Sequence, residues 1–191
     1  MVAAAVPELS GLPHDVRRSA IGVGDLEAAC GLSATLAIGT ARAVILVGTC
    51  GALVPDLELD QIVVVDFAVR PLKGPGIEVP EAIATGQGAD GPLVDKLAGP
   101  LDARRVTCLS GRGMTVTDGE AALAAREHSA HVENLEVFAV LRACARAKVP
   151  VTAILAVGYR AGDGARADLT EHRSVAEAHA ISAVARALAY I

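Results

Sequence analysis

Residues 43–53 read AVILVGTCGAL, and this stretch decides the fold. The uninterrupted apolar run at 43–47 is the pattern of a strand that is buried on both faces. The glycine-rich segment GTCGA at 48–52 follows at the carboxyl end of that strand, where open α/β sheets bind ligands. A hydroxyl beside glycine amides can hold an oxyanion or a sugar oxygen, so Thr49, Cys50 and Gly51 are candidate binding residues, with a tight turn as the alternative.

On both sides of this stretch, segments rich in β-branched residues alternate with Ala-rich segments of helical period, as βαβ units do. The segment 71–91 is dense in Gly and Pro, which predicts a long loop, and Pro150 ends the helix that precedes it. We therefore predict an α/β fold. Strands are expected at 2–6, 18–23, 43–47, 61–69, 105–110 and 151–157, and helices at 25–38, 93–98, 118–128, 137–148 and 169–189.

The composition limits the class of protein. A chain of 191 residues, 52% hydrophobic and 2% aromatic, suits one domain over 1–191 with a core of small and branched aliphatic side chains. The formal charge of −5 and scattered basic residues argue against a nucleic-acid partner. No apolar run of about 18 residues and no basic leader occur, so we expect no membrane partner and a soluble, cytoplasmic protein. The four cysteines lack a Cys-x-x-Cys pair, as reduced buried thiols do.

Three further segments carry residues that suit a binding site. Gly24 ends the Gly22-Val23-Gly24 turn between a predicted strand and a helix, where backbone amides favour an anion, although a plain tight turn is the commoner explanation. Glu133 and Glu136 precede an apolar helix, so helix capping accounts for at least one of them. Tyr159 follows the last predicted strand, with packing as its default role. The histidines form no convincing metal set, and neither a metal nor an organic cofactor is expected.

Together these segments resemble the nucleoside phosphorylase and nucleosidase superfamily, which includes purine nucleoside phosphorylase, methylthioadenosine/adenosylhomocysteine nucleosidase and futalosine hydrolase. Residues 44–53 and 59–64 are similar to the family's strand, Gly-Ser/Thr-x-Gly-Gly/Ala turn and Gly-Asp-Ile-Val continuation. IGVG at 21–24 resembles the Gly-Ile-Gly turn, and VENLE at 132–136 resembles Val-Asp/Glu-x-Met-Glu, with Leu135 in place of Met. With a resemblance over nearly the whole chain, we expect a three-layer α/β/α sandwich with a mixed, mostly parallel sheet.

The resemblance implies cleavage of the N-glycosidic bond of a purine-type nucleoside through a transition state with positive charge on the sugar. Glu136 would bind the ribose hydroxyl pair, and Gly24 and Thr49 would line the pocket beneath the sugar. Cys50, Gly51 and Leu135 complete the expected binding residues. Glu8 falls where the first strand of nucleosidases ends in an acid that orients water, which would make it the general base. The resemblance also implies a homo-oligomer.

Three positions depart from the family's pattern. The Asp that protonates the leaving base aligns with Gly158-Tyr159, which makes Tyr159 the candidate in its place. Leu46 occupies the position of a phosphate-binding Arg, which favours hydrolysis and leaves phosphate as an open alternative partner. The aromatic residue that usually stacks on the base, near 114–117, is missing. Two alternatives to an enzyme therefore remain: a catalytically degenerate nucleoside-binding or sensor protein, and a scaffold with a vestigial pocket.

Overall fold

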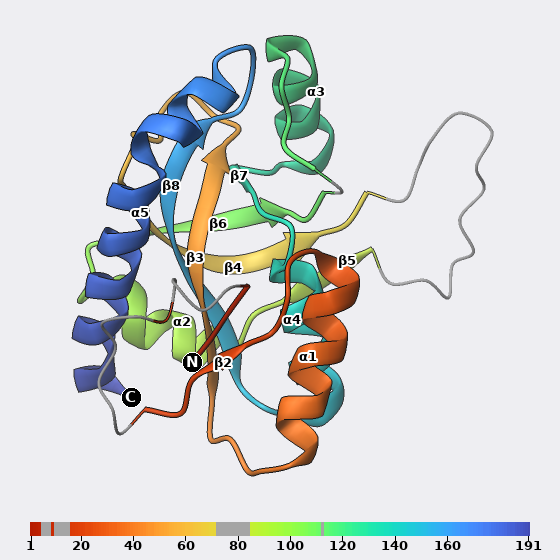
Figure 1. The fold of residues 1–191 in the computed structure, drawn as a ribbon, viewed down its shortest axis with the longest axis vertical. Helices are drawn as coiled ribbons and strands as arrows, with labels where there is room; N and C mark the ends of the chain where they lie inside the picture. The colour runs from red at the N-terminus through yellow and green to blue at the C-terminus, as the bar shows by residue number, and fades with distance from the viewer. Residues whose placement is uncertain (5–8, 10–15, 72–84, 112) are drawn as a thin grey trace, which may run out of the picture.

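The computed structural model describes residues 1–4, 9, 16–71, 85–111 and 113–191, and it places a twisted sheet between two groups of helices (Figure 1). This order of elements confirms the predicted α/β class. The described strands are β1 (Val2–Ala3), β2 (Ser19–Ala20), β3 (Val44–Ala52), β4 (Ile62–Val69), β5 (Gly86–Gly88), β6 (Arg104–Leu109), β7 (Val132–Glu133) and β8 (Val151–Arg160). The helices are α1 (Asp25–Ala37), α2 (Gly91–Ala98), α3 (Asp118–His128), α4 (Val137–Ala147) and α5 (Ala165–Ala187), with a final 3-10 turn, η2 (Leu188–Tyr190).

The sheet is mixed, and most of its pairings are parallel, as predicted. Parallel pairs join β2, β1, β3 and β8 in that order, and β4, β6 and β7. Antiparallel pairs join β3 to β7, β4 to β8 and β4 to β5. Because β3 pairs with both β7 and β8, and β4 with both β6 and β8, the centre of the sheet closes into a ring. Register shifts at Cys50/Gly51 and Val65/Phe67 bend the strands, as such closure requires.

Each face of the sheet has its own core. Helices α1 and α4 pack together on one face, around buried side chains such as Leu32 and Val140. Helices α5 and α2 cover the other face, around Ile45 and Val184. Figure 1 shows α5 on the opposite side of the sheet from the α1 and α4 pair, with α3 above. The observed layers thus match the predicted sandwich. The closure of the sheet's centre into a ring was not predicted.

Small side chains let α5 lie close to the sheet. Ala176, Ala180, Ala183 and Ala187 recur at helical spacing and are fully buried, facing β8 and β3. A larger side chain at these positions would overfill the contact and move the helix outward. Although α5 has 23 residues, none of the described helices is both long enough and apolar enough to cross a membrane.

Two glycine-containing segments continue strands that the sequence predicts to end. The predicted ends at 47 and 157 are wrong, because β3 runs to Ala52 and β8 runs to Arg160. The physical reason is that the two segments pair with each other, and Gly51 of β3 stands opposite Tyr159 of β8. Glycine in a strand interior commonly marks a bulge or a close approach of another group, and both occur here. The candidate residues of 48–52 therefore lie in a bulged strand rather than in a turn.

Candidate functional site

Glu136 is a buried carboxylate beside an open glycine. Its side chain is 5% exposed, and its Oε1 accepts a hydrogen bond of 2.8 Å from the backbone N–H of Gly24. Gly24 has a φ of 86°, a conformation that favours glycine, and a Cβ built at Gly24 would meet nothing within 4 Å. The turn before α1 therefore brings a backbone amide to the acid and leaves space beside it. We name Gly24, Asn134 and Glu136 the Glu136 corner.

Asn134 ties this corner to the end of β3. Its Nδ2 donates to the carbonyl of Thr49 at 3.0 Å, and its Oδ1 accepts from the backbone N–H groups of Glu136 at 2.8 Å and Val137 at 3.0 Å. The amide side chain thus caps α4, whereas Glu136 makes no side-chain capping bond. Our expectation that capping accounts for one of the two acids is wrong, because Glu133 lies in β7 and Asn134 performs the capping. Asn just before an apolar helix is the signal that could have identified this residue.

The electrostatics of Glu136 follow from its position. Burial raises the pKa of this carboxyl above its ordinary value, and the Gly24 N–H and the Asn134 side chain oppose the rise by stabilising the charge. A buried acid is costly unless hydrogen bonds or a ligand compensate it. The corner can therefore gain from a partner that donates hydrogen bonds or carries positive charge.

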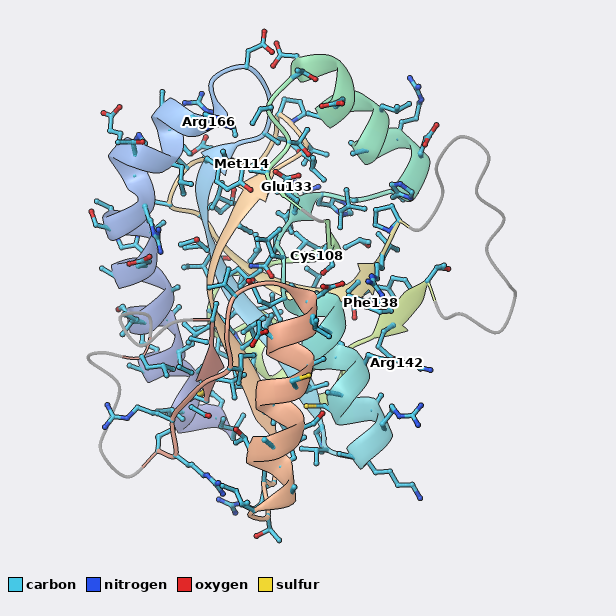
Figure 2. All side chains as sticks on the ribbon, turned by 45° about the vertical axis from the view of Figure 1, so that its right-hand side comes forward. Cys108, Met114, Glu133, Phe138, Arg142 and Arg166 are labelled. Atoms are coloured by element: carbon cyan, nitrogen blue, oxygen red, sulfur yellow. The ribbon has the colours of Figure 1, made fainter. Side chains whose placement is uncertain are left out.

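Glu133 is a second buried carboxylate, and three donors already bind it. Its Oε1 accepts from the N–H of Thr115 at 2.8 Å and from the hydroxyl of Tyr159 at 2.9 Å, while its Oε2 accepts from the hydroxyl of Thr115 at 2.5 Å. Figure 2 shows Glu133 beside Met114 near the upper end of the sheet. We name Thr115, Glu133 and Tyr159 the Glu133 corner. Its polar atoms bind one another, so the segment after residue 113 is fixed to the sheet.

Gly51 makes the Glu133 corner possible. It pairs with Tyr159 on β8 and with Glu133 on β7, so all three residues stand in one row across the sheet. A Cβ built on Gly51 would lie 2.3 Å from Cε2 of Tyr159 and 2.8 Å from its hydroxyl oxygen. The Tyr159 ring therefore crosses directly over Gly51 to reach Glu133. The absence of a side chain at Gly51 makes room for the Tyr159 ring. The role of Gly51 as a ligand contact stays a prediction.

The other predicted site residues have different positions. Cys50 is 1% exposed in the core, its thiol faces the carbonyl of Ala156 at 3.6 Å, and burial raises the pKa of that thiol. Thr49 and Leu135 are partly buried, and Thr49 contacts the Glu136 corner through its carbonyl. Glu8 lies outside the described residues. The structure thus brings Gly24, Thr49 and Glu136 together and places Tyr159 with Glu133.

An arginine lies beside the turn that precedes α1. The guanidinium of Arg70 pairs with Asp25, the first residue of α1, at 2.6 Å. Leu46 is 2% exposed inside the core and offers no polar group. In the part of the chain that the structure describes, no three His, Cys, Asp or Glu side chains are placed to share a metal ion.

A cavity of about 790 Å³ opens at the other end of the sheet. Its wall includes Val44 and Ile45 at the start of β3, roughly 20 Å along the strand from Gly51 at about 3.3 Å per residue. Its lining combines many apolar side chains with the basic residues Arg17, Arg42 and Lys96. We place the candidate site at the Glu136 corner nevertheless, because a buried acid, an open glycine amide and a strand end meet there.

Solved structures of other proteins share this fold at low sequence identity. No curated protein sequence matches the chain. The 5′-methylthioadenosine/S-adenosylhomocysteine nucleosidase of Neisseria meningitidis, in complex with methylthio-immucillin-A, gives a TM-score of 0.87 at 17% identity, over 100% of this chain and 98% of that chain. A futalosine hydrolase mutant of Helicobacter pylori gives 0.90 at 12% identity, over 100% and 97%. At such identities the likeness establishes the fold alone.

The family itself is established by sequence. The family model described as Phosphorylase superfamily matches residues 15–191, which is most of the chain. The match includes the segments at 21–24, 44–53 and 132–136 on which the resemblance was based. The chain belongs to the phosphorylase superfamily.

Proposed function

We propose that this protein hydrolyses the N-glycosidic bond of a purine-type nucleoside. The observation that carries the proposal is the buried carboxylate of Glu136, held by the Gly24 amide next to open space at the carboxyl end of β3. Family membership supports the reaction class, and the similar nucleosidase of Neisseria meningitidis is in complex with a nucleoside analogue. Base release from a panel of purine nucleosides, measured by chromatography, tests the proposal.

The chemistry follows from charge. As the bond between C1′ and the base nitrogen breaks, positive charge develops on the sugar, and the Glu136 carboxylate stabilises it while accepting hydrogen bonds from the ribose hydroxyls. Ligand binding also supplies the donors that compensate the burial of this acid. Thr49 would line the pocket beneath the sugar, and Glu8 would orient the attacking water.

Hydrolysis is proposed over phosphorolysis because the position of the family's phosphate-binding Arg holds the apolar Leu46, and the arginine beside Gly24 has an acidic partner. Leu46 is buried in the core, and Arg70 beside Gly24 is already paired with Asp25. Holding a phosphate dianion there without a cation would be costly. We expect base release to proceed in phosphate-free buffer. Activity that appears only when phosphate is added, with ribose 1-phosphate as product, would contradict this choice.

A second candidate function is nucleoside binding without turnover. The observation that favours it is the Tyr159 hydroxyl, which donates to Glu133 instead of standing free as an acid. Thermal stabilisation by adenosine, with no base released from adenosine or from any other nucleoside tested over a long incubation, would establish the binding protein. Base release would establish the enzyme.

We further propose a homo-oligomer, as family membership suggests, with the segment 71–91 or the Ala-rich helices at the contact. Most of that segment lies outside the described residues. Sedimentation at micromolar concentration tests the proposal, and a single species near 19.4 kDa would contradict it.

A further inference from the structure

We propose that this site acts on ribosides whose leaving group departs without receiving a proton from the protein, above all N-ribosides with a cationic base. The inference rests on the proposed function and narrows its substrate class. It starts from Tyr159, the residue that stands at the predicted position of the general acid. The geometry of the Glu133 corner decides whether that residue can act as one.

The hydroxyl proton of Tyr159 already forms a hydrogen bond within the protein. A phenol has one proton to donate, and here it goes to Oε1 of Glu133 at 2.9 Å. The ring lies directly over Gly51 of β3, and the side chain is buried. Burial, and then the charge of Glu133, raise the pKa of the phenol well above its ordinary value. Tyr159 can offer a ligand lone pairs, but not an acidic proton.

Among the described residues, none of the neighbouring acidic groups can take the place of Tyr159 as a proton donor to the base. Glu133 accepts three hydrogen bonds, so its carboxylate oxygens are already engaged within the corner. Burial raises the pKa of the thiols of Cys50 and Cys108, so they are weak acids. Asp118 and Asp163 each accept the backbone N–H of the other. The remaining buried acid, Glu136, lies at Gly24, where the proposed function places the ribose rather than the base.

This arrangement selects the leaving group. A neutral purine that is not protonated departs as an anion, which is unfavourable, and general acid catalysis contributes about 10²–10⁴-fold where it is present. A base with a fixed positive charge needs no proton. When its C1′–N bond breaks, the electron pair stays on the nitrogen and cancels the charge. The water oxygen forms the new bond to C1′, and its proton passes to solvent.

Adenosine and 7-methyladenosine form a matched pair of probes, because one methyl group fixes the positive charge on the base. Base release is measured for both, with the enzyme-free rate subtracted. We expect kcat/KM for 7-methyladenosine to exceed that for adenosine by about 100-fold or more, the lower end of a typical acid-catalysis contribution. The p-nitrophenyl β-D-ribofuranoside, which releases a stable anion, should also be cleaved. Because this probe carries no methyl group, its cleavage would show that the protein selects the leaving group and not the methyl substituent.

Variants at Tyr159 give an independent readout. Tyr159→Phe should lower kcat/KM modestly and alike for both nucleosides, whereas Tyr159→Asp should raise it for adenosine alone. Tyr190→Phe is the matched control, because Tyr190 is exposed in the final turn η2, which Figure 1 shows at the other end of the molecule from the upper end of β8. Tm values of all variants identify any that fail to fold. A loss in Tyr159→Phe that is confined to adenosine would identify Tyr159 as the acid and overturn the inference.

The possible results separate this inference from the proposed function. Equal cleavage of adenosine and 7-methyladenosine by the unmodified protein would overturn the inference and leave the proposed function standing. Absence of cleavage of all three probes would overturn the proposed function, and the inference with it. Selective cleavage of the two activated probes supports both.

Discussion

Glu133 and Glu136 are two buried carboxylates three residues apart, yet they differ in what surrounds them. Glu133 accepts three hydrogen bonds from Thr115 and Tyr159, and a tyrosine ring covers the adjacent strand. Glu136 accepts a hydrogen bond from Gly24, beside which a Cβ would meet nothing within 4 Å. Burial raises the pKa of Glu136, which shows that its hydrogen bonds do not fully compensate the charge. Glu133, whose oxygens are occupied by protein donors, therefore suits a structural role. Glu136, whose charge is only partly compensated and which lies next to open space, suits ligand binding.

The largest expected effect is on stability at the Glu133 corner. Glu133→Ala leaves the buried donors of Thr115 and Tyr159 without an acceptor, which should cost about 3 kcal/mol of unfolding free energy. For a chain of this size, this corresponds to a fall in Tm of roughly 6–12 °C. Glu127→Ala on α3 is the control, because an exposed substitution should change stability by less than about 0.5 kcal/mol. A loss below about 1 kcal/mol in Glu133→Ala would remove the structural role of this corner.

A smaller loss of stability is expected at Gly51. Gly51→Ala would place a Cβ 2.3 Å from the Tyr159 ring, so the ring must move, at a cost of about 2 kcal/mol. Gly119→Ala, in the first turn of α3 where a Cβ has no neighbour within 4 Å, should leave Tm unchanged or raise it. In the double variant with Tyr159→Ala the cost of Gly51→Ala should disappear. Additive losses would show that the two residues do not interact.

Turnover should depend on the other carboxylate. Glu136→Gln keeps an acceptor for the Gly24 N–H but removes the charge, so we expect turnover to fall at least about tenfold, or roughly 1.4 kcal/mol of barrier. The matched change Glu133→Gln should affect Tm more than turnover. If Glu133→Gln abolished turnover in a folded protein and Glu136→Gln were harmless, the roles of the two acids would be exchanged.

The smallest effect is the pH dependence of stability. Because the pKa of Glu136 is raised in the folded protein, its stabilising contribution is complete below the unfolded value and is lost as pH rises through the folded value. The Glu136→Gln variant has no ionisable carboxyl at this position, so its stability should not fall with pH in this way. The Tm of the variant minus that of the unmodified protein should therefore increase from pH 4 upward and then level off. A difference that stayed constant, or fell, over pH 4–8 would contradict the assigned direction.

The sequence predicted the elements that depend on local pattern. Helix α3 has the predicted bounds, and α4 differs by one residue, because Thr117 and Pro150 are local boundary signals. The buried strands β3, β4 and β8 follow from their apolar runs. At the start of α1 the pattern was less informative, since Leu26 is 70% exposed and Ala28 is buried. In an Ala-rich helix the apolar stripe is weakly defined, and packing against α4 determines the buried face.

The contacts that form the two corners were not predictable from local pattern. Gly24 and Glu136 are 112 residues apart, and Glu133 and Tyr159 are 26 apart. Their meeting depends on strand register, which one sequence does not reveal. The glycines at 48–52 suggested a turn because a strand glycine and a turn glycine look alike in sequence. The pairing of this segment with β8 and the ring of Tyr159 over Gly51 distinguish them.

A crystal structure with a C-nucleoside analogue of adenosine, whose carbon–carbon glycosidic bond is not cleaved, tests the central claim most directly. If Glu136 is the ligand-binding carboxylate, the ribose O2′ and O3′ will lie within about 3 Å of its oxygens, and the Glu133–Tyr159 hydrogen bond will persist. Ribose hydroxyls bound to Glu133 with the Tyr159 bond broken, or a nucleoside seated only in the cavity beside Arg17 and Lys96, would contradict the account.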